Sequence, residues 1–449
     1  MDPAWTPEAI RSARLAAGWD AARLARELKR AAGREATATT ESLTRSIRNW
    51  EAGRTRPRER YRLLLDRLLG PAPSTQPPAP GEGAAEEPGS FPAPGQAWTA
   101  AGALTTLKAV VADGDGITRR ALLVAAGAQA GAHVLQWALA EPAEAARAGT
   151  GPVSPGMVAA VEAGIAELRM ADAARGSAGL VPLARPQLVL LHRLLESGPD
   201  AATALRLHAA AADLAGLIGW MLVDAGEHAA AQRYFAAGLR SAHAAGAPVL
   251  GAGIASYVAV QSYGLGAGRE AALLAHTALA RASGPASPHV EAMLHTRAAR
   301  GHAVAGDPAA AERALERARE CFVRGPSSDD PEWLYWMSPG EMHAQAAGAH
   351  LELGEHGRAH EELAAASRSF GPGCVRDRAM CAIRQAGALV GMGELDGACE
   401  RAHAALDLAQ GVGSARLAEK VEGFLSAARG GGSMVDDVRE RAALLWRSP

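Results

Sequence analysis

The side chains best suited to chemistry lie in one short segment near the N-terminus. Leu43, Ile47 and Trp50 have the spacing of one apolar stripe on a helix predicted from about Thr40 to Ala52. The opposite face of this helix carries four polar side chains, Thr44, Arg45, Arg48 and Asn49. Arginine can donate two hydrogen bonds to guanine, and asparagine can pair in a similar way with adenine, so this face suits the reading of base edges.

Three further arginines follow this helix, namely Arg54, Arg56 and Arg58. Guanidinium groups beside a base-reading helix are expected to contact phosphates. Residues 1–70 hold 15 basic and 9 acidic side chains, a net charge of +6, whereas the rest of the chain carries −8. A polyanion is therefore expected to meet only the N-terminal part. The alternative is that the arginine face is solvated and serves contacts with proteins.

Four short helices are expected to position these side chains, over residues 6–18, 20–32, 40–52 and 57–70. Proline stands near the start of the first and fourth helices, where its missing N–H group costs nothing. Glycine ends the first, third and fourth helices. The segment is thus predicted to be a small helical domain.

One string in this domain carries a family resemblance. Ile47-Arg48-Asn49-Trp50-Glu51-Ala52-Gly53, followed by Pro57, resembles the signature of Xre-type (lambda-repressor-like) helix-turn-helix domains. The resemblance implies that the third helix enters the major groove of double-stranded DNA. Two features depart from the family: Asp20-Ala21 replaces its Ser/Thr-Gln, and the connection from Gly33 to Thr39 is long. The phosphate contact of the family glutamine is therefore not expected here.

The rest of the chain divides by composition. Residues 71–97 contain eight prolines and four glycines and are predicted to be an extended linker. Residues 98–204 form a helical region that leads into repeats over 205–430, and 431–449 form a capping helix. Aromatic residues make up only 4% of the chain, so alanine and leucine must supply the core. Such residues pack between helices, and the predicted class is all-α.

The repeats are marked by glycines at nearly constant spacing, Gly226, Gly266, Gly306, Gly354 and Gly393. Small residues recur seven positions before, five after and twelve after each of these glycines. This register predicts pairs of closely packed helices joined by glycine turns, which must stack on neighbouring pairs to bury their apolar faces. It resembles the tetratricopeptide repeat over roughly residues 205–410. The period is nearer 40 than 34 residues, and the usual proline at the repeat end is missing.

The first helix of each pair lines the concave surface in repeats of that family. The resemblance therefore implies a groove for a peptide, small molecule or protein partner, with candidate residues Trp220, Ser256, Thr296 and Arg300. Arg300 is the only fixed charge among the predicted groove positions and suits a carboxylate. The segment from Asp329 to Trp336 adds three aromatic side chains, which either pack over the groove or form a contact surface.

The sequence gives little support to an enzyme. It lacks a Walker-type phosphate loop, a Gly-x-Ser-x-Gly string and a His-Glu-x-x-His string. His356 and His360 share a helix face but lack a clear third ligand, so neither a metal nor another cofactor is expected. The four cysteines form no Cys-x-x-Cys pair, and the N-terminus lacks the pattern of a signal peptide, which favours the cytoplasm and no membrane partner.

Together the two resemblances imply a cytoplasmic bacterial transcriptional regulator that binds a palindromic operator as a homodimer. The same architecture occurs in peptide-sensing regulators of Gram-positive bacteria and in many actinobacterial chains. Two alternatives remain at this point. One is a tetratricopeptide scaffold whose helix-turn-helix serves as a protein-interaction module, and the other is a hydrolase or metal enzyme built on helical repeats.

Overall fold

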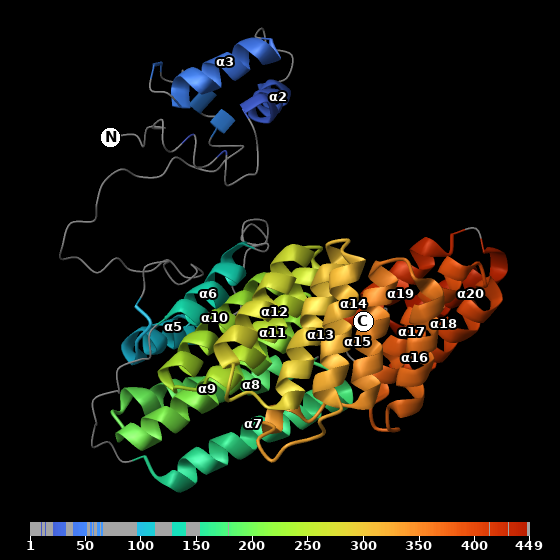
Figure 1. Ribbon diagram of the computed structural model, residues 1–449. Coiled ribbons are helices and arrows are strands. Elements are labelled where there is room, and N and C mark those ends of the chain that lie inside the picture. The colour runs from blue at the N-terminus through green and yellow to red at the C-terminus, as the bar shows by residue number, and fades with distance from the viewer. Residues whose placement is uncertain are drawn as a thin grey trace. The chain divides into compact units, whose positions relative to one another are not determined.

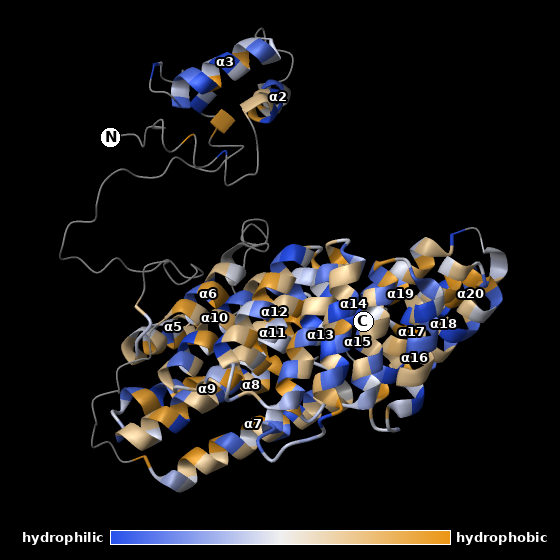
Figure 2. Ribbon diagram, viewed as in Figure 1, coloured by the Kyte–Doolittle hydropathy of each residue, from blue (hydrophilic) through white to orange (hydrophobic). Residues whose placement is uncertain are grey.

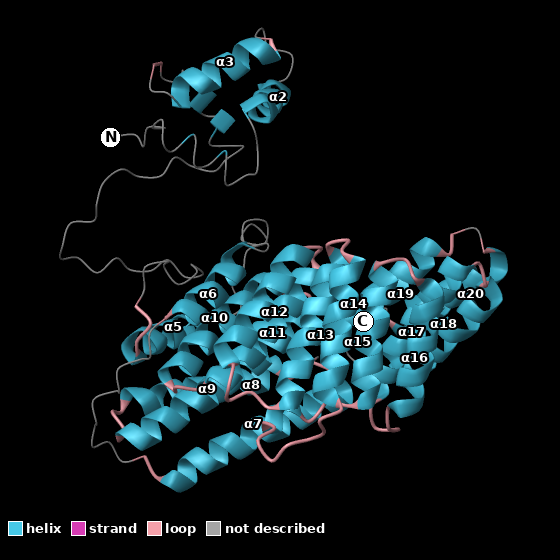
Figure 3. Ribbon diagram, in the orientation of Figure 1, coloured by secondary structure: helices cyan, strands magenta, loops and turns pink. Residues whose placement is uncertain are grey.

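The computed structural model of the chain is helical, with no strand in the part that it describes (Figure 3). The chain divides into two compact units, Met1–Ala85 and Glu86–Pro449. The first unit is described at residues 10, 14, 21–32, 39–51, 54–55, 57, 61–62 and 64–65. The second is described at residues 97–112, 128–140 and 153–446, apart from 178, 413 and 430. The all-α class expected from composition is confirmed.

In the first unit, two helices pack against each other, α2 (Ala21–Ala32) and α3 (Thr40–Glu51). Their bounds agree within one residue with two of the predicted helices. Most of the predicted first and fourth helices, and the connection between α2 and α3, lie outside the described residues. The described core of this unit is made of eight side chains, Ile10, Leu24, Ala25, Leu28, Leu43, Ile47, Trp50 and Leu65.

The second unit contains a series of consecutive helix pairs (Figure 1). Five pairs are joined by the glycines that the repeat pattern singles out, and the helices of each pair contact each other. They are α9 (Ala201–Asp224) with α10 (His228–Ala244), α11 (Pro248–Gly264) with α12 (Gly268–Ala282), α13 (Pro288–Val304) with α14 (Pro308–Phe322), α15 (Pro339–Glu352) with α16 (His356–Ser369), and α17 (Val375–Met392) with α18 (Leu395–Ala409).

The small residues of the repeat explain how the helices approach so closely. The five turn glycines have φ between 74° and 83°, a left-handed conformation that favours glycine. All fifteen small residues at the three recurring positions are buried. At one of them, Gly219, a Cβ atom would collide with the ring of Phe235 on the partner helix. The predicted register is therefore the register of the packed pairs.

Four helices precede the five pairs: α5 (Ala100–Ala112), α6 (Ala128–Leu139), α7 (Pro155–Arg175) and α8 (Val181–Glu196). Helix α5 packs on α8 and α10, and α6 packs on α10 and α12. Trp137 of α6 is fully buried against Gly251 of α11. Helices α7 and α8 both contact α9, and α7 also contacts α17. The helical region expected before the repeats is therefore present, and its helix α7 also reaches a distant part of the series.

The series ends with α19 (Ala415–Ala427) and α20 (Gly432–Leu445). The sequence predicts a capping box in which Ser433 opens the last helix. This prediction is wrong, because α20 has no side-chain cap and Ser433 lies inside its first turn. The N-cap is Gly431, whose N–H donates to the carbonyl of Ala428 at 3.2 Å, so the helix starts one residue before the serine.

Two contacts bring distant helices of the second unit together. The guanidinium of Arg376 on α17 lies 3.4 Å from the carboxylate of Asp172 on α7. The hydroxyl of Ser414, just before α19, donates to the carboxylate of Asp224 at the end of α9 at 2.9 Å. The residues of these pairs are 204 and 190 positions apart in the sequence. The series of pairs therefore curves until its late helices touch its early ones.

Candidate functional site

The predicted base-reading face lies on α3. Leu43, Ile47 and Trp50 are buried, whereas Arg45 and Arg48 are exposed. Figure 2 shows hydrophilic and hydrophobic residues side by side on this helix. The helix is thus amphipathic in the sense that the sequence predicts, with two cations free to meet a ligand.

The other predicted contact residues of this region differ in their exposure to solvent. Thr44 and Asn49 are half-buried, and the hydroxyl of Thr44 donates to the carbonyl of Thr40 at 2.8 Å. Arg54 is exposed, and its backbone N–H donates to the carbonyl of Asn49 at 2.9 Å. Arg56 and Arg58 lie outside the described residues. The base-reading and phosphate-binding roles of all seven residues remain predictions.

Two side chains of the Trp-Glu string hold α3 in place. Glu51 accepts two hydrogen bonds from Arg14, at 2.6 and 3.1 Å, and both side chains are largely buried. Such a bidentate pair fixes both distance and orientation. The ring of Trp50 lies 5.5 Å from that of Tyr61. The C-terminal end of α3 is therefore anchored by Arg14, which precedes the helix in sequence, and by Tyr61, which follows it.

The second unit encloses a cavity of about 480 Å³. Its walls come from the first helix of successive pairs, α9, α11, α13, α15, α17 and α19, together with α7 and the segment between α14 and α15. This volume lies in the range of pockets that bind small molecules. First helices of the pairs thus supply much of this wall, as the tetratricopeptide resemblance implies for a groove, whose ligand role stays a prediction.

Much of the cavity wall is aromatic. The rings of Trp220 and Tyr257 lie 5.3 Å apart with an angle of 31° between their planes. Burial strongly raises the pKa of Tyr257, so this phenol stays neutral. The segment between α14 and α15 contributes three further rings, Trp333, Tyr335 and Trp336.

This segment includes a short 3₁₀ helix, η3 (Glu332–Leu334), and Leu334 is buried in the main core. Trp333 packs on Gly253, where a Cβ atom would be 2.9 Å from its ring. The hydroxyl of Tyr335 donates to the carbonyl of Arg169 on α7 at 3.5 Å. The segment therefore packs on α11 and α7, while Tyr335 is also exposed, so its use as a contact surface stays a prediction.

Charged groups occupy the rest of the wall. Four of its arginines have a carboxylate within ion-pair distance: Arg169 with Asp213 at 2.5 Å, Arg376 with Asp172 at 3.4 Å, Arg416 with Asp224 at 3.7 Å, and Arg297 with Glu341 at 3.8 Å. Arg416 also stacks over the ring of Trp220, 4.9 Å from its centroid. Burial raises the pKa of Glu341 and of Asp377 in the same wall, because a charged carboxylate loses hydration there.

The four candidate groove residues are placed differently from one another. Trp220 lines the cavity. Ser256 and Thr296 are buried, and each hydroxyl donates to a carbonyl of its own helix, of Gly253 and Met293 respectively. Arg300 is not among the lining residues; it stacks on Tyr263 and lies 3.4 Å from Glu352. The structure brings Trp220 to the cavity and leaves the ligand role of the four residues a prediction.

The sequence did not indicate that the arginines Arg297 and Arg384 line the cavity, nor that α7 forms part of its wall. Arg384 stands nine positions before the turn glycine Gly393, whereas the predicted groove residues Ser256 and Thr296 stand ten before theirs, so a slightly wider helical face would have included it. Arg169 and Asp172 gave no signal, because nothing in a local pattern indicates that α7 lies beside α17.

The histidines and cysteines form no further candidate centre. No group of three or more His, Cys, Asp or Glu residues suited to a metal occurs among the described residues. All four cysteines are free thiols, and burial raises the pKa of Cys381, in the cavity wall, to about 12. Helix α9 is long and apolar enough to cross a membrane, but 83% of its apolar window is buried among its neighbours, as in a core helix.

Comparison with protein-family models and with curated proteins finds no match to this chain.

Proposed function

We propose that this protein is a transcriptional regulator with a DNA-binding unit and a separate ligand-sensing unit. The observation that carries the proposal is helix α3, whose apolar stripe is buried while Arg45 and Arg48 stand exposed on the other face. A helix held by its core and presenting arginine and amide groups has the chemistry needed to read base edges.

The string that ends α3 supports a helix-turn-helix of the Xre type. Trp50 belongs to the core and Glu51 is paired with Arg14, so both side chains hold the helix rather than meet DNA. That division leaves the preceding polar residues for the major groove. Arg54, exposed just after the helix, is placed to meet a phosphate.

The second unit would act as the sensor. Its glycine-turned helix pairs suit a tetratricopeptide-like solenoid, and its cavity has the size of a small-molecule site. In this proposal the unit also joins two copies of the chain, so that the homodimer meets the two halves of a palindromic operator in the cytoplasm. A ligand in the cavity regulates DNA binding only if it favours one geometry of the dimer over another.

The DNA-binding proposal is tested with the full chain. Sites are selected from a library of random DNA duplexes, and the best site is titrated at several salt concentrations with wild type, Arg48→Ala and Arg26→Ala. Arg26 is an exposed arginine of α2 in the same unit, so its variant removes the same charge from another helix.

We expect wild type to recover a palindrome. Arg48→Ala should reduce discrimination against a changed base by about 5- to 150-fold, the value of one good bidentate contact. Arg26→Ala should keep the sequence preference. If all three proteins bind without preference and with the same salt dependence, α3 does not read sequence, and a protein-interaction role for this unit is favoured instead.

A further inference from the structure

One arginine of the cavity wall has no acidic partner. Arg384 of α17 lines the cavity, and its Nη1 donates to the carbonyl of Ala344 at 3.3 Å. Among the described residues, no carboxylate lies within ion-pair distance of it. Burial and the neighbouring Arg300 lower the pKa of Arg384 to about 10, so it remains charged at neutral pH. The charge of Glu341 acts on Arg384 from a distance, but Arg384 lacks the directly paired carboxylate that buried charges normally require.

A second arginine in the same wall is more deeply buried and incompletely bonded. Arg297 of α13 is only 4% exposed, and its Nε and Nη1 atoms have no hydrogen-bond partner. Its nearest carboxylate, that of Glu341, is 3.8 Å away, beyond hydrogen-bond distance. The guanidinium stacks on the ring of Trp336, 5.3 Å from its centroid. Two buried N–H donors of this side chain are therefore unsatisfied, which is uncommon for buried polar groups.

A glycine in α15 allows two arginine side chains to lie close together beside the cavity. A Cβ atom at Gly348 of α15 would collide with the guanidinium groups of both Arg300 and Arg384, so the two cations converge over one glycine. Like charges at such a short distance repel each other. Of the two, Arg300 has a carboxylate neighbour, Glu352, at 3.4 Å, which leaves Arg384 as the cation to be neutralised.

The remaining wall is suited to a flat, apolar group. Trp220, Tyr257, Trp333 and Trp336 present rings to a cavity of about 480 Å³. Aromatic faces bind planar ligands by offset or edge-to-face contacts, which are worth more than the burial of their area alone. The cavity therefore combines a site for rings with a site for one negative charge.

We propose that this cavity binds a planar aromatic molecule that carries one anionic group, with the anion at Arg384 and Arg297 and the rings between the aromatic side chains. The regulatory meaning of such a ligand rests on the sensor role proposed above, whereas its binding does not. A purely apolar ligand would leave Arg384 without a counter-charge, and a polycation would be repelled.

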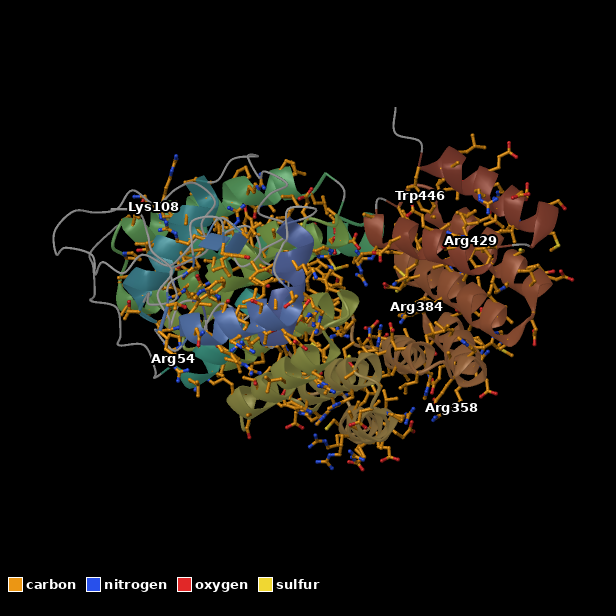
Figure 4. The ribbon with its side chains drawn as sticks, turned by 90° about the horizontal axis from the view of Figure 1, so that it is seen from above. Arg54, Lys108, Arg358, Arg384, Arg429 and Trp446 are labelled. Atoms are coloured by element: carbon orange, nitrogen blue, oxygen red, sulfur yellow. The ribbon has the colours of Figure 1, made fainter. Side chains whose placement is uncertain are left out.

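The test uses the full chain and two dyes with nearly the same rings. Anilinonaphthalene sulfonate has one negative charge, and phenylnaphthylamine is its uncharged counterpart. Binding of each is followed by dye fluorescence and by quenching of tryptophan emission. The variants are Arg384→Gln and Arg358→Gln. Figure 4 shows Arg384 on the inner side of the curved series of helices and Arg358 on its outer side.

We expect the sulfonate to bind wild type at one equivalent. Arg384→Gln should weaken this binding by about tenfold or more, the value of a hydrogen bond to a charged group. The same variant should bind the uncharged dye as wild type does, which also shows that its cavity is intact. Arg358→Gln should leave both dyes unaffected, because Arg358 pairs with Glu312 and Glu355 away from the cavity.

Three results would overturn the proposal: equal binding of the sulfonate by wild type and Arg384→Gln, equal weakening by both variants, or weakening of both dyes alike in Arg384→Gln. None of these measurements contains DNA. A failure here therefore leaves the reading of DNA by α3 open, and a failure of that reading leaves the cavity proposal intact.

Discussion

Arginine is the residue that gives this protein its particular chemistry. The second unit stacks four arginines on aromatic rings: Arg240 on Trp98, Arg297 on Trp336, Arg300 on Tyr263 and Arg416 on Trp220. A guanidinium is planar and weakly hydrated, so it can lie on a ring in a partly buried place where an ammonium would lose more hydration. With only three lysines in the chain, nearly every cation has this option.

A buried histidine gives a prediction at the same scale. His208 of α9 is 4% exposed, and burial lowers its pKa to about 4. In the unfolded chain the pKa of this histidine is near 6.5, so the unfolded state binds the proton more tightly than the folded state does. The folded state therefore loses stability as the pH falls from about 6.5 to 4. The shift corresponds to about 3 kcal/mol at most. In His208→Gln this part of the acid sensitivity should disappear.

The measurement is denaturant unfolding of wild type and His208→Gln at several pH values between 7 and 4.5. The difference between the two free energies of unfolding should move steadily in favour of the variant as the pH falls. Carboxylates and other histidines titrate in the same range, but both proteins contain them, so their contributions cancel in the difference. Parallel curves would show that His208 is not held neutral by the fold.

At the scale of elements, helix pairing depends on where a side chain is missing. Gly219 of α9 faces Phe235 of α10 so closely that even a methyl group would strike the ring. Gly423 of α19 is also inside a helix, but it is exposed and has no atom within 4 Å of a Cβ position. The same substitution at the two glycines therefore separates close packing from helix propensity.

We expect Gly219→Ala to destabilise the second unit by about 1–3 kcal/mol, because the core must shift to admit the methyl group. Gly423→Ala should stabilise it by about 0.5–1 kcal/mol, since alanine loses less backbone entropy in a helix. Thermal or denaturant unfolding measures both. A loss of stability in Gly423→Ala, or none in Gly219→Ala, would contradict this view of the pairs.

At the scale of the second unit as a whole, the decisive feature is that its curve closes. Asp224 at the end of α9 is 1% exposed, accepts a hydrogen bond from Ser414 and lies 3.7 Å from Arg416. Arg376 and Asp172 make a parallel connection between α17 and α7. These contacts border the cavity, so they set how far its two ends are apart.

Asp224→Ala should release α19 from α9, because it removes the acceptor for Ser414 and the counter-charge of Arg416. Hydrogen exchange of the amides in α19 should become about tenfold faster or more, as expected for the loss of a hydrogen bond to a charged group. Asp436→Ala is the control, since Asp436 is exposed and pairs with Arg439 of its own helix, α20. Unchanged exchange in Asp224→Ala would show that other contacts close the curve.

The local structure of this protein can be predicted from the spacing of its residues. Helical periodicity placed Leu43, Ile47 and Trp50 on the inner face of α3, and the turn glycines with their alanines marked which helices pair and where they touch. Both patterns act over one or two helices, a distance at which residue spacing alone fixes which side chains share a face.

The pairing of charges, in contrast, depends on how distant helices come together in the folded chain. The contacts of Arg376 with Asp172 and of Ser414 with Asp224 join residues about 200 positions apart. They exist because small rotations from one helix pair to the next add up to a closed curve. Because of the same curvature, Arg384, Arg297 and the aromatic rings line one cavity. The spacing of residues within one helix pair does not reveal the total of these rotations, so the cavity could be found only in the folded chain.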